Sequence, residues 1–262
     1  MNIGVIGFGT VGKAVAKGFS IRKHLIFIND LEKQPNIKRT SKANLMKNCD
    51  FIFVCVPTPK QEDGTINLEF VNSTIKELDD NYTIFNEPII VIKSSVVPGT
   101  TDFFECEFPN LKFVCNPEFL REKHAETDFD HPDRIVIGTS NKKIGYKLVE
   151  LYKSWNCPII LTLSLVAETI KYIANSLLVA KVSFSCEVAE ICKVYGVNAE
   201  EVMNAVTLDH RINRSHLDPT LGAIQMNSPC LPKDLLALIK HLESKDYQSS
   251  FLQEVFNRGV ST

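Results

Sequence analysis

Seven short apolar runs, each with the length of a β-strand, occur before residue 163. The runs do not alternate with polar residues, which is the pattern of strands whose two faces are both covered. Candidate helices, such as 67–78 and 142–154, separate many of the runs. Strands that alternate with helices predict a doubly wound parallel α/β sheet of the Rossmann type. The predicted strands are 2–6, 24–29, 51–56, 89–93, 111–115, 134–138 and 159–162.

The pattern changes after residue 164, where no turn signal occurs until Gly196. Within this stretch, apolar residues recur at the i, i+3, i+4, i+7 spacing of an amphipathic helix. The spacing predicts one long helix over 165–195 that Gly196 ends. Further helices are predicted over 198–206 and from 232 onward. The residues that set the spacing are Ile170, Ile173, Ala174, Leu177 and Leu178.

The loop after the first predicted strand has the glycine spacing G-x-G-x-x-G. Between a strand and a helix, the first glycine allows a tight turn and the second lets a pyrophosphate approach the backbone. The third lets the helix pack closely on the strand, and the N-terminus of that helix then faces the phosphates. The alternative is a purely structural turn. The predicted dinucleotide-binding residues are Gly7, Phe8, Gly9, Thr10, Val11 and Gly12.

Asp30 ends the next predicted strand. A carboxylate at this place accepts hydrogen bonds from a ribose 2′-hydroxyl and repels a 2′-phosphate, so it favours NAD over NADP. Lys33, Lys38 and Arg39 follow and could tolerate a phosphate, which keeps NADP as the alternative.

Lys171 and Asn175 lie four residues apart in the predicted long helix, so they share one face. A solvated face is the common interpretation of such a pair. The surrounding helix is apolar enough to be buried, however, and a buried polar pair needs a partner, either structural or substrate. Near a substrate, a lysine cation can stabilise an oxyanion and an asparagine can hold a hydroxyl group.

Composition narrows the class of protein. The chain has 262 residues, 44% of them hydrophobic, and a formal net charge of −2, which gives no basic surface for nucleic acid. No apolar run approaches the ~20 residues of a membrane span, and the N-terminus does not resemble a signal peptide. The eight cysteines have neither C-x-x-C nor zinc spacing. We expect a cytoplasmic protein with reduced thiols, without a metal, and without nucleic-acid or membrane partners.

One cysteine has an unusual neighbourhood. In SPCLPKDLL, residues 228–236, Cys230 lies between two prolines and just ahead of Lys233 and Asp234. The cysteine either packs in a tight turn or is held rigid because it reacts. Pro232 favours a helix start behind it, and the N-terminus of a helix stabilises a thiolate, which is the reactive form of cysteine.

Seven segments together resemble the nucleotide-sugar 6-dehydrogenase family, whose members include UDP-glucose and GDP-mannose dehydrogenases. The segments NPEFLRE (116–122) and CLPKD (230–234) are far more specific than the glycine loop. The resemblance implies an NAD-binding domain over 1–164 and a helical central domain over 165–262, which serves catalysis and pairing into a homodimer. The resembling segments are 4–12, 53–59, 91–101, 116–138, 167–189, 208–212 and 230–234.

The resemblance implies a four-electron oxidation, in which the C6 primary alcohol of a nucleotide sugar such as UDP-glucose becomes a carboxylate and two NAD⁺ are reduced. Cys230 is then the nucleophile that forms a thiohemiacetal with the aldehyde and, after the second oxidation, a thioester that water hydrolyses. Lys171 and Asn175 stabilise the oxyanion-bearing intermediates. Asp234 and Glu118 handle protons and position water.

The resemblance also implies contacts around the reacting groups. Ser95 occupies a position where the family usually has threonine, and it keeps the hydroxyl for catalysis and cofactor binding. Glu122 is similar to a residue that contacts the nicotinamide side of the cofactor, and Pro57 and Thr58 belong to the cofactor pocket. The implied substrate contacts are Phe119, Leu120, Arg121, Lys171, Asn175 and Arg211.

Three departures from the family leave the identity of the nucleotide sugar open. The segment 219–229 contains Gly222 alone, where the family has a glycine-rich loop around the sugar and diphosphate. The segment after Asp30 is short. The chain stops at Thr262, so we expect the family's C-terminal domain, which closes over the nucleotide, to be absent. Binding energy from such a remote part of the substrate helps to orient the reacting end.

Two alternatives remain. A two-electron dehydrogenase of the β-hydroxyacid type also combines a Rossmann domain, a helical domain and a Lys-x-x-x-Asn pair, but it lacks the segments NPEFLRE and CLPKD. A non-catalytic nucleotide-binding remnant of the family would bind the cofactor without reducing it.

Overall fold

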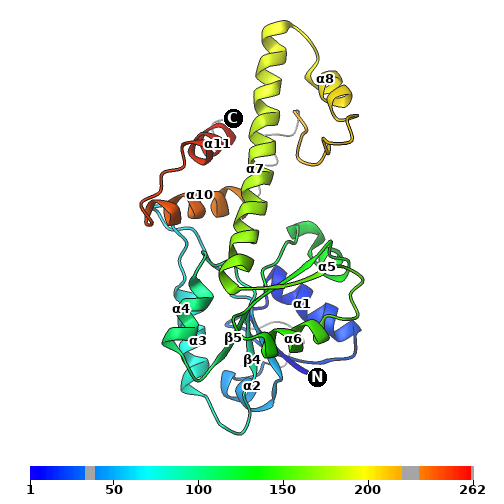
Figure 1. Ribbon diagram of the computed structural model, residues 1–262. Helices are drawn as coiled ribbons and strands as arrows, with labels where there is room; N and C mark the ends of the chain where they lie inside the picture. Colours follow the sequence, from blue (N-terminus) through cyan, green and yellow to red (C-terminus); the bar gives the residue numbers. More distant parts are fainter. Residues whose placement is uncertain (33–38, 220–229, 261–262) are drawn as a thin grey trace. The chain divides into compact units, whose positions relative to one another are not determined.

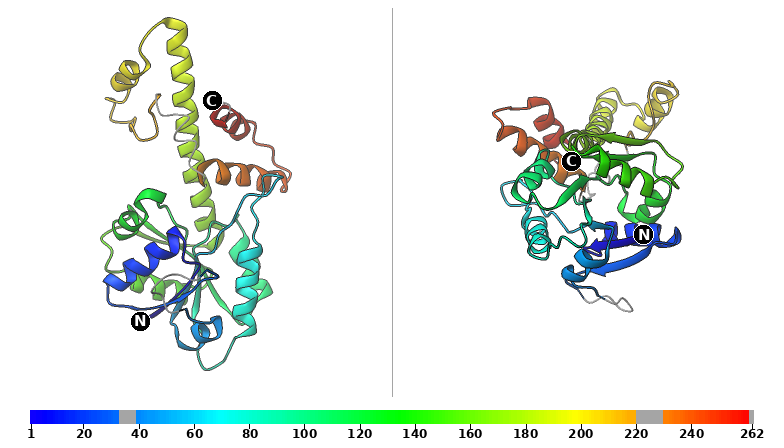
Figure 2. Two further views of the ribbon diagram at one scale, coloured as in Figure 1. Left: turned by 180° about the vertical axis from the view of Figure 1, so that it is seen from behind. Right: turned by 60° about the horizontal axis from the view of Figure 1, so that its bottom comes forward.

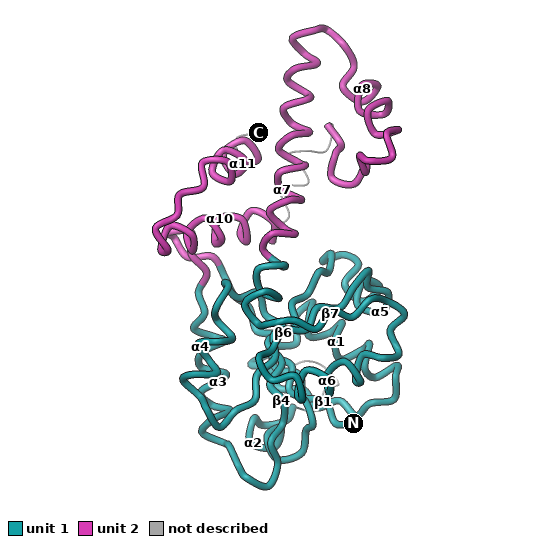
Figure 3. The backbone as a smooth tube through the Cα atoms, in the orientation of Figure 1, with its two compact units in different colours: residues 1–59, 67–171 teal, residues 60–66, 172–262 magenta. Residues whose placement is uncertain are grey.

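The computed structural model describes residues 1–32, 39–219 and 230–260 (Figure 1). The chain divides into two compact units (Figure 3). Unit 1 comprises Met1–Pro59 and Asn67–Lys171, and unit 2 comprises Lys60–Ile66 and Tyr172–Thr262. The functions predicted for residues 1–164 and 165–262 stay predictions.

Unit 1 is built on a seven-stranded sheet with the strand order β2-β1-β3-β4-β5-β6-β7. Every predicted strand is present, and each end lies within two residues of its predicted place, because apolar runs covered on both faces are a strong sequence signal. The strands are β1 Asn2–Ile6, β2 Leu25–Asn29, β3 Phe51–Val54, β4 Ile89–Ile92, β5 Lys112–Cys115, β6 Ile135–Gly138 and β7 Ile159–Thr162.

The predicted doubly wound parallel sheet is confirmed, and one pair of its strands is antiparallel. β5 and β6 are antiparallel, through Cys115 opposite Gly138, whereas the other five pairs are parallel. A parallel return needs a long crossover, usually a helix. The connection from β5 to β6 instead holds a short 3-10 helix η1, Glu122–His124, and the six-residue α5, Ala125–Asp130. The chain therefore re-enters the sheet from the edge at which β5 ends.

Helices cover both faces of the sheet, as the doubly wound prediction requires. Side chains alternate between faces along a strand, and Phe51 and Phe53 of β3 belong to one core cluster while Ile52 and Val54 belong to another. The first cluster packs under α1, α5 and α6, and the second under α2, α3 and α4; Figure 2 shows α1 (dark blue) and α3 (cyan) on opposite sides of the sheet. The remaining helices of unit 1 are α1 Thr10–Ile21, α2 Lys42–Asn48, α3 Glu69–Asp80, α4 Thr100–Glu107 and α6 Lys142–Leu151.

The long helix is confirmed as α7, Ser164–Tyr195, and Gly196 follows it with a φ of +67°. Its apolar positions do not decide which face is buried, however. Ile173 and Leu177 are 53% and 61% exposed, while Tyr172 and Asn175 are buried. When a helix is apolar on more than one face, the elements that pack against it determine which face is buried.

The described part of unit 2 contains three further helices, α8 Ala199–Val206, α10 Cys230–Glu243 and α11 Ser250–Val260. Val179 and Val182 of α7 pack with Leu235 of α10 and Val255 of α11. The helix predicted from 232 begins two residues earlier, at Cys230. Proline has no N–H to lose within the first turn, where N–H groups lack helical partners, so Pro232 does not mark the first helical residue.

Candidate active site

The glycine loop follows β1, at the point where the strand order reverses, between β1 and β3. Ligands of open α/β sheets bind at the carboxyl ends of strands at such a point. Gly7 has a φ of +86°, and a Cβ added to it would lie 2.6 Å from the Cys55 carbonyl oxygen. A Cβ on Gly12 would lie 1.9 Å from the Gly7 carbonyl oxygen. Both positions therefore exclude any side chain.

Gly9 differs, because a Cβ added to it would meet nothing within 4 Å. Packing does not require a glycine there, whereas the close approach of a pyrophosphate to the backbone does. Gly9 is also the N-cap of α1 and supplies no side-chain cap, so the first-turn N–H groups of Thr10, Val11 and Gly12 lack a helical or capping partner. This arrangement fits a dinucleotide.

Asp30 is turned toward the same loop. Its Oδ2 accepts a hydrogen bond from the Phe8 backbone N–H, and its Oδ1 accepts one from the Glu32 N–H at 2.8 Å. These bonds orient the carboxylate at the end of β2, where an NAD ribose is recognised in this fold. Of the basic residues that follow, Arg39 is described and pairs with Ile28 in an isolated bridge, while Lys33 and Lys38 lie outside the described residues.

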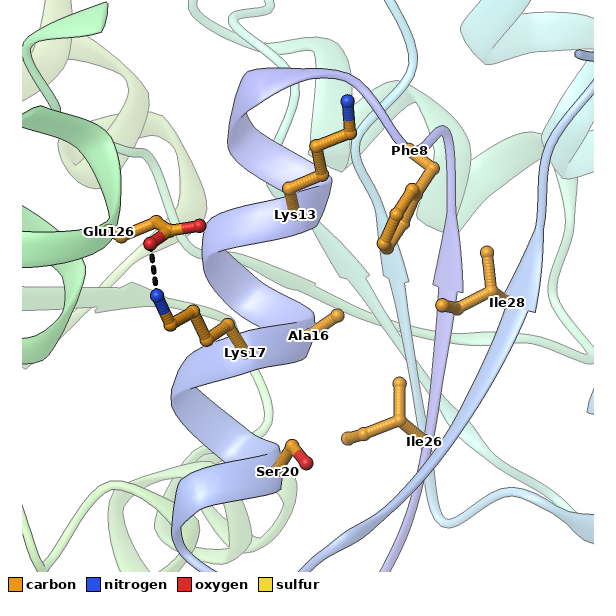
Figure 4. A pocket seen from close by; sticks show the side chains of 8 residues that line it. All are labelled: Phe8, Lys13, Ala16, Lys17, Ser20, Ile26, Ile28 and Glu126. Atoms are coloured by element: carbon orange, nitrogen blue, oxygen red, sulfur yellow. Dashed lines mark hydrogen bonds and ion pairs between the residues drawn. The ribbon is translucent and has the colours of Figure 1, made fainter. Parts of the chain in front are cut away.

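Two pockets of about 330 Å³ flank α1. In the first, the Phe8 ring lies between α1 and β2, beside Ile28 and below the extended Lys13 side chain (Figure 4). The second pocket joins the start of α1 to the loop after β5, and it is lined by Thr10 and by the predicted nicotinamide contact Glu122. The second pocket thus connects two parts of the predicted cofactor site.

The other predicted cofactor residues follow neighbouring strands. Pro57 and Thr58 come after β3, and Ser95 comes after β4; Thr58 is buried, Ser95 is half-buried and Pro57 is exposed. The hydroxyl of Ser94 donates to the Val56 carbonyl at 2.7 Å, which ties these two loops together.

Lys171 and Glu118 form a buried ion pair. Lys171 Nζ lies 2.6 Å from Glu118 Oε1, with side chains only 5% and 12% exposed. The second oxygen of Glu118 accepts the Leu120 N–H at 2.6 Å. Burial opposes the ionisation of Glu118, but Lys171, the Leu120 N–H and Lys93 outweigh it and lower the pKa of this carboxyl. At neutral pH the pair is therefore a carboxylate beside a cation.

The loop that carries Glu118 also presents Phe119 and Arg121. The Phe119 ring lies 4.0 Å from the Arg134 guanidinium and 5.7 Å from Lys171 Nζ. Arg121 binds Asp128 through its backbone N–H at 2.8 Å and its guanidinium at 2.6 Å. The predicted substrate contacts Phe119 and Arg121 are thus held in cationic and ion-pair contacts of their own.

A second buried pair lies in unit 2. Asn175 Nδ2 donates to Asp234 Oδ2 at 2.7 Å, and the two residues are 7% and 1% exposed. Lys233 Nζ lies 2.8 Å from Asp234 Oδ1. Cys230 is exposed and begins α10, one turn before Asp234. A thiolate at the first turn of a helix is favoured by the helix dipole.

Arg211 is exposed and binds Asp209 on its own segment at 2.5 Å. The loop residues 220–229, including Gly222, lie outside the described residues. Within each unit, the structure brings together Lys171 with Glu118, Asn175 with Asp234, and Phe8 with Asp30. The roles assigned to the individual residues stay predictions.

Sequence reasoning missed two buried polar groups near these pairs. Lys93, directly after β4, is 6% exposed, and Glu168 of α7 is 1% exposed. A charged residue next to a fully apolar strand run was the available signal for Lys93. The sequence contains no such signal for Glu168, because its hydrogen-bond partners lie about 70 residues away along the chain.

Comparisons with known proteins agree with this fold and site. Residues 32–156 match the NAD binding domain of the UDP-glucose/GDP-mannose dehydrogenase family, and residues 165–258 match its central domain. The solved structure of a UDP-glucose dehydrogenase from Pyrobaculum islandicum superposes with a TM-score of 0.89 at 30% identity, over 99% of this chain and 68% of that one. The chain belongs to the UDP-glucose/GDP-mannose dehydrogenase family, and the predictions of the family and of its cofactor NAD are confirmed.

Curated relatives differ in substrate and are longer. The UDP-glucose 6-dehydrogenase of Rickettsia prowazekii is 34% identical over 220 residues, which are 81% of this chain and 50% of that protein. The GDP-mannose 6-dehydrogenase of Pseudomonas aeruginosa is 30% identical over 291 residues, 96% of this chain and 66% of that protein. The chain thus spans between half and two thirds of these relatives. Among the described residues, no helix combines the length and apolar character needed to cross a membrane.

Proposed function

We propose that this protein oxidises the C6 primary alcohol of a nucleotide sugar, of the UDP-glucose type, to the uronic acid with two NAD⁺. The observation that carries the proposal is the pair of buried polar contacts on α7, Lys171 with Glu118 and Asn175 with Asp234, four residues apart on one helix. Burial of polar groups is unfavourable unless they are paired, and both of these pairs are buried. A cation and an amide can stabilise an oxyanion, and two carboxylates can accept protons, in such an oxidation.

The cofactor would be held by the first turn of α1, Gly9 and Asp30, and by the pocket that contains Glu122. When bound, NAD⁺ accepts a hydride from the sugar carbon. Ser95 and Thr58 contribute hydroxyl groups from the loops after β4 and β3. The alcohol, two NAD⁺ and one water yield the carboxylate, two NADH and three protons.

Cys230 provides the covalent step. Its thiolate attacks the aldehyde carbon, a C–S bond forms, and the carbonyl electron pair moves onto oxygen. The Lys171 ammonium and the Asn175 amide N–H stabilise this oxyanion. Covalent capture divides one difficult oxidation into two steps and retains the aldehyde.

The two carboxylates serve the hydrolysis. After the second oxidation the carbon is a thioester, and water attacks it while Glu118 or Asp234 accepts the proton. The C–S bond then breaks, and sulfur leaves as the Cys230 thiolate. Phe119, Leu120, Arg121 and Arg211 are proposed to contact the sugar.

The test is the amount of NADH formed per sugar, with UDP-glucose, GDP-mannose and UDP-N-acetyl sugars offered in turn. We expect two NADH per sugar with one of these substrates. The Cys230→Ser variant should form no carboxylate. Cys106→Ser removes the other exposed cysteine and serves as the control, with unchanged turnover. One NADH per substrate and an active Cys230→Ser would favour the two-electron alternative. Cofactor binding without NADH formation would favour the non-catalytic one.

We also propose that the protein forms a homodimer through α7. This helix exposes large apolar side chains at spacings of four and seven residues, which a second copy would cover. They are Val166, Ile173, Leu177, Phe184, Ile191 and Tyr195. Light scattering should give twice the chain mass of 29.5 kDa, and Phe184→Asp should lower it. A monomeric mass for the unmodified protein would refute the proposal.

A further inference from the structure

Lys93 is a buried lysine with neutral hydrogen-bond partners. It is 6% exposed, and its Nζ donates to Asn116 Oδ1 at 3.0 Å and to the Pro117 carbonyl at 3.5 Å. An ammonium group removed from water normally requires a nearby anion. No carboxylate accepts a hydrogen bond from Lys93 among the described residues, so its charge must be balanced at longer range.

The partner Asn116 makes two further hydrogen bonds. Its Oδ1 also accepts a hydrogen bond from the Tyr152 hydroxyl at 2.8 Å, and its Nδ2 donates to the Val136 carbonyl at 2.7 Å. Asn116 thus fixes the start of the Asn-Pro-Glu segment that ends in Glu118. Lys93 holds one side of this anchor and Tyr152 holds the other.

Among the titratable groups that face Lys93, Glu118 is the one that carries a negative charge near pH 7. Burial raises the pKa of the Cys55 thiol to about 12 and that of Cys115 well above its ordinary value, so both thiols are neutral near pH 7. Burial likewise raises the pKa of the Tyr152 hydroxyl, and the Phe129 ring lies 5.8 Å from Lys93 Nζ. The remaining groups are the cation Lys171 and the carboxylate Glu118.

Glu118 therefore lies in the field of two cations. Lys171 binds it directly, and Lys93 Nζ donates to the carbonyl of Pro117, the residue before Glu118. Both cations lower the pKa of Glu118. Burial lowers the pKa of Lys93 itself to about 8. Lys171 has the direct contact, so Lys93 is the cation whose charge can change in the neutral range without breaking the ion pair.

We propose that Lys93 is a positioning residue for Glu118, because its ammonium, anchored on Asn116, holds that carboxyl ionised and in place. The inference rests on the proposed function for its catalytic meaning. An ionised Glu118 held in place is the form that can accept the proton of water in the proposed hydrolysis.

The test is a titration of the Glu118 carboxyl carbon by NMR, in the full chain labelled with ¹³C-glutamate and without cofactor or sugar. The Glu118 signal is assigned with Glu118→Gln. We expect Lys93→Met to raise the pKa of Glu118 by about one unit or more, and Lys93→Arg to leave it low. Tyr152→Phe is the matched control, since it removes a hydrogen bond to the same Asn116 oxygen without removing a charge. Its titration should follow the unmodified protein.

An unchanged pKa in Lys93→Met, or equal shifts in Lys93→Met and Tyr152→Phe, would overturn the inference. If Lys93→Met does not fold, the unmodified protein still decides, because the Glu118 signal should show a second inflection near pH 8 and its absence refutes the coupling. The titration does not depend on activity. A shifted pKa without NADH formation from any sugar would refute the proposed function alone, and NADH formation with an unshifted pKa would refute the role of Lys93 alone.

Discussion

Glu168 offers the sharpest test of how α7 is held in unit 1. Its Oε2 accepts the Gly99 N–H at 2.6 Å, and its Oε1 accepts the Thr101 N–H at 2.8 Å and the Thr101 hydroxyl at 2.6 Å. Gly99 is the N-cap of α4 and has no side chain to cap with. The Glu168 carboxylate of α7 therefore caps the N-terminus of α4, where a negative charge is favoured.

Glu168→Gln replaces one of these oxygens with an NH₂ group, which then faces an N–H donor. A hydrogen bond to a charged group contributes about 1.5–3 kcal/mol, and relief of the buried charge offsets part of the loss. We expect a net decrease of about 2 kcal/mol in the free energy of unfolding, or a fall of about 4–8 °C in melting temperature. Glu168→Ala leaves Thr101, which is fully buried, without its acceptor and should lose roughly 4 kcal/mol.

The assay is equilibrium unfolding in urea, followed by the fluorescence of Trp155, the single tryptophan, which is buried in unit 1. The control is Glu150→Gln, which breaks an exposed i, i+3 pair with Lys153 and should change the free energy of unfolding by less than about 0.5 kcal/mol. Equal losses in the two Gln variants would refute the reasoning, since they would mean that burial of the three hydrogen bonds does not matter.

The same variant gives a pH dependence with a defined sign. Burial raises the pKa of Glu168, although the Thr101 and Gly99 hydrogen bonds oppose it. The folded state then holds the proton more tightly than the unfolded state, so the contribution of Glu168 to stability is largest below the unfolded pKa and declines as the pH rises through the folded pKa. The difference between the unmodified protein and Glu168→Gln should shrink from about pH 4.5 upward. A difference that grows with pH would contradict the raised pKa.

Two further predictions concern glycines. A Cβ at Gly12 meets the Gly7 carbonyl at 1.9 Å, so Gly12→Ala should lose at least ~2 kcal/mol of unfolding free energy. A Cβ at Gly9 meets nothing within 4 Å, so Gly9→Ala should lose less than ~0.5 kcal/mol, but calorimetry should show at least ~10-fold weaker NAD binding. Equal melting temperatures of the two variants would contradict these roles. Gly64 has a φ of +89° and a Cβ there would lie 2.8 Å from Leu236 Cδ2 of α10, so Gly64→Ala should lose about 1–2 kcal/mol. The double variant Gly64→Ala with Leu236→Ala should lose less unfolding free energy than the sum of the losses in the two single variants. A loss equal to that sum would show that the contact is not made.

The fold was largely predictable because its strands are buried on both faces, which produces apolar runs that hardly depend on context. The direction of β6 was not predictable, since the residues Ile135–Gly138 are compatible with either a parallel or an antiparallel pairing with β5. The buried face of α7 was not predictable either, because apolar residues occupy more than one side of that helix and only packing with α10 and α11 selects between them.

The candidate site was predictable in part. The i, i+4 spacing placed Lys171 and Asn175 on one face, but their partners Glu118 and Asp234 lie 53 and 59 residues away along the chain. Only the resemblance to a family pointed to them. Glu168 has no local pattern of its own, and the only signal for Lys93 is a charged residue directly after an apolar strand run. The partners of either buried charge are recognisable only once they are located in space.

Glu168, Lys171 and Asn175 follow one another on α7 at spacings of three and four residues, and all three are buried. Each meets a different partner: the α4 N-terminus, Glu118 and Asp234. A helix selected for stability alone would carry apolar residues at these positions, because replacing buried ion pairs by well-packed apolar groups is often neutral or stabilising. A single substitution at Lys171 is nonetheless ambiguous, since it leaves the Glu118 carboxylate buried without its cation and lowers stability as well as activity. Lys171→Met combined with Glu118→Gln removes both charges, so a stable but inactive double variant would separate the contribution of this pair to catalysis from its contribution to folding.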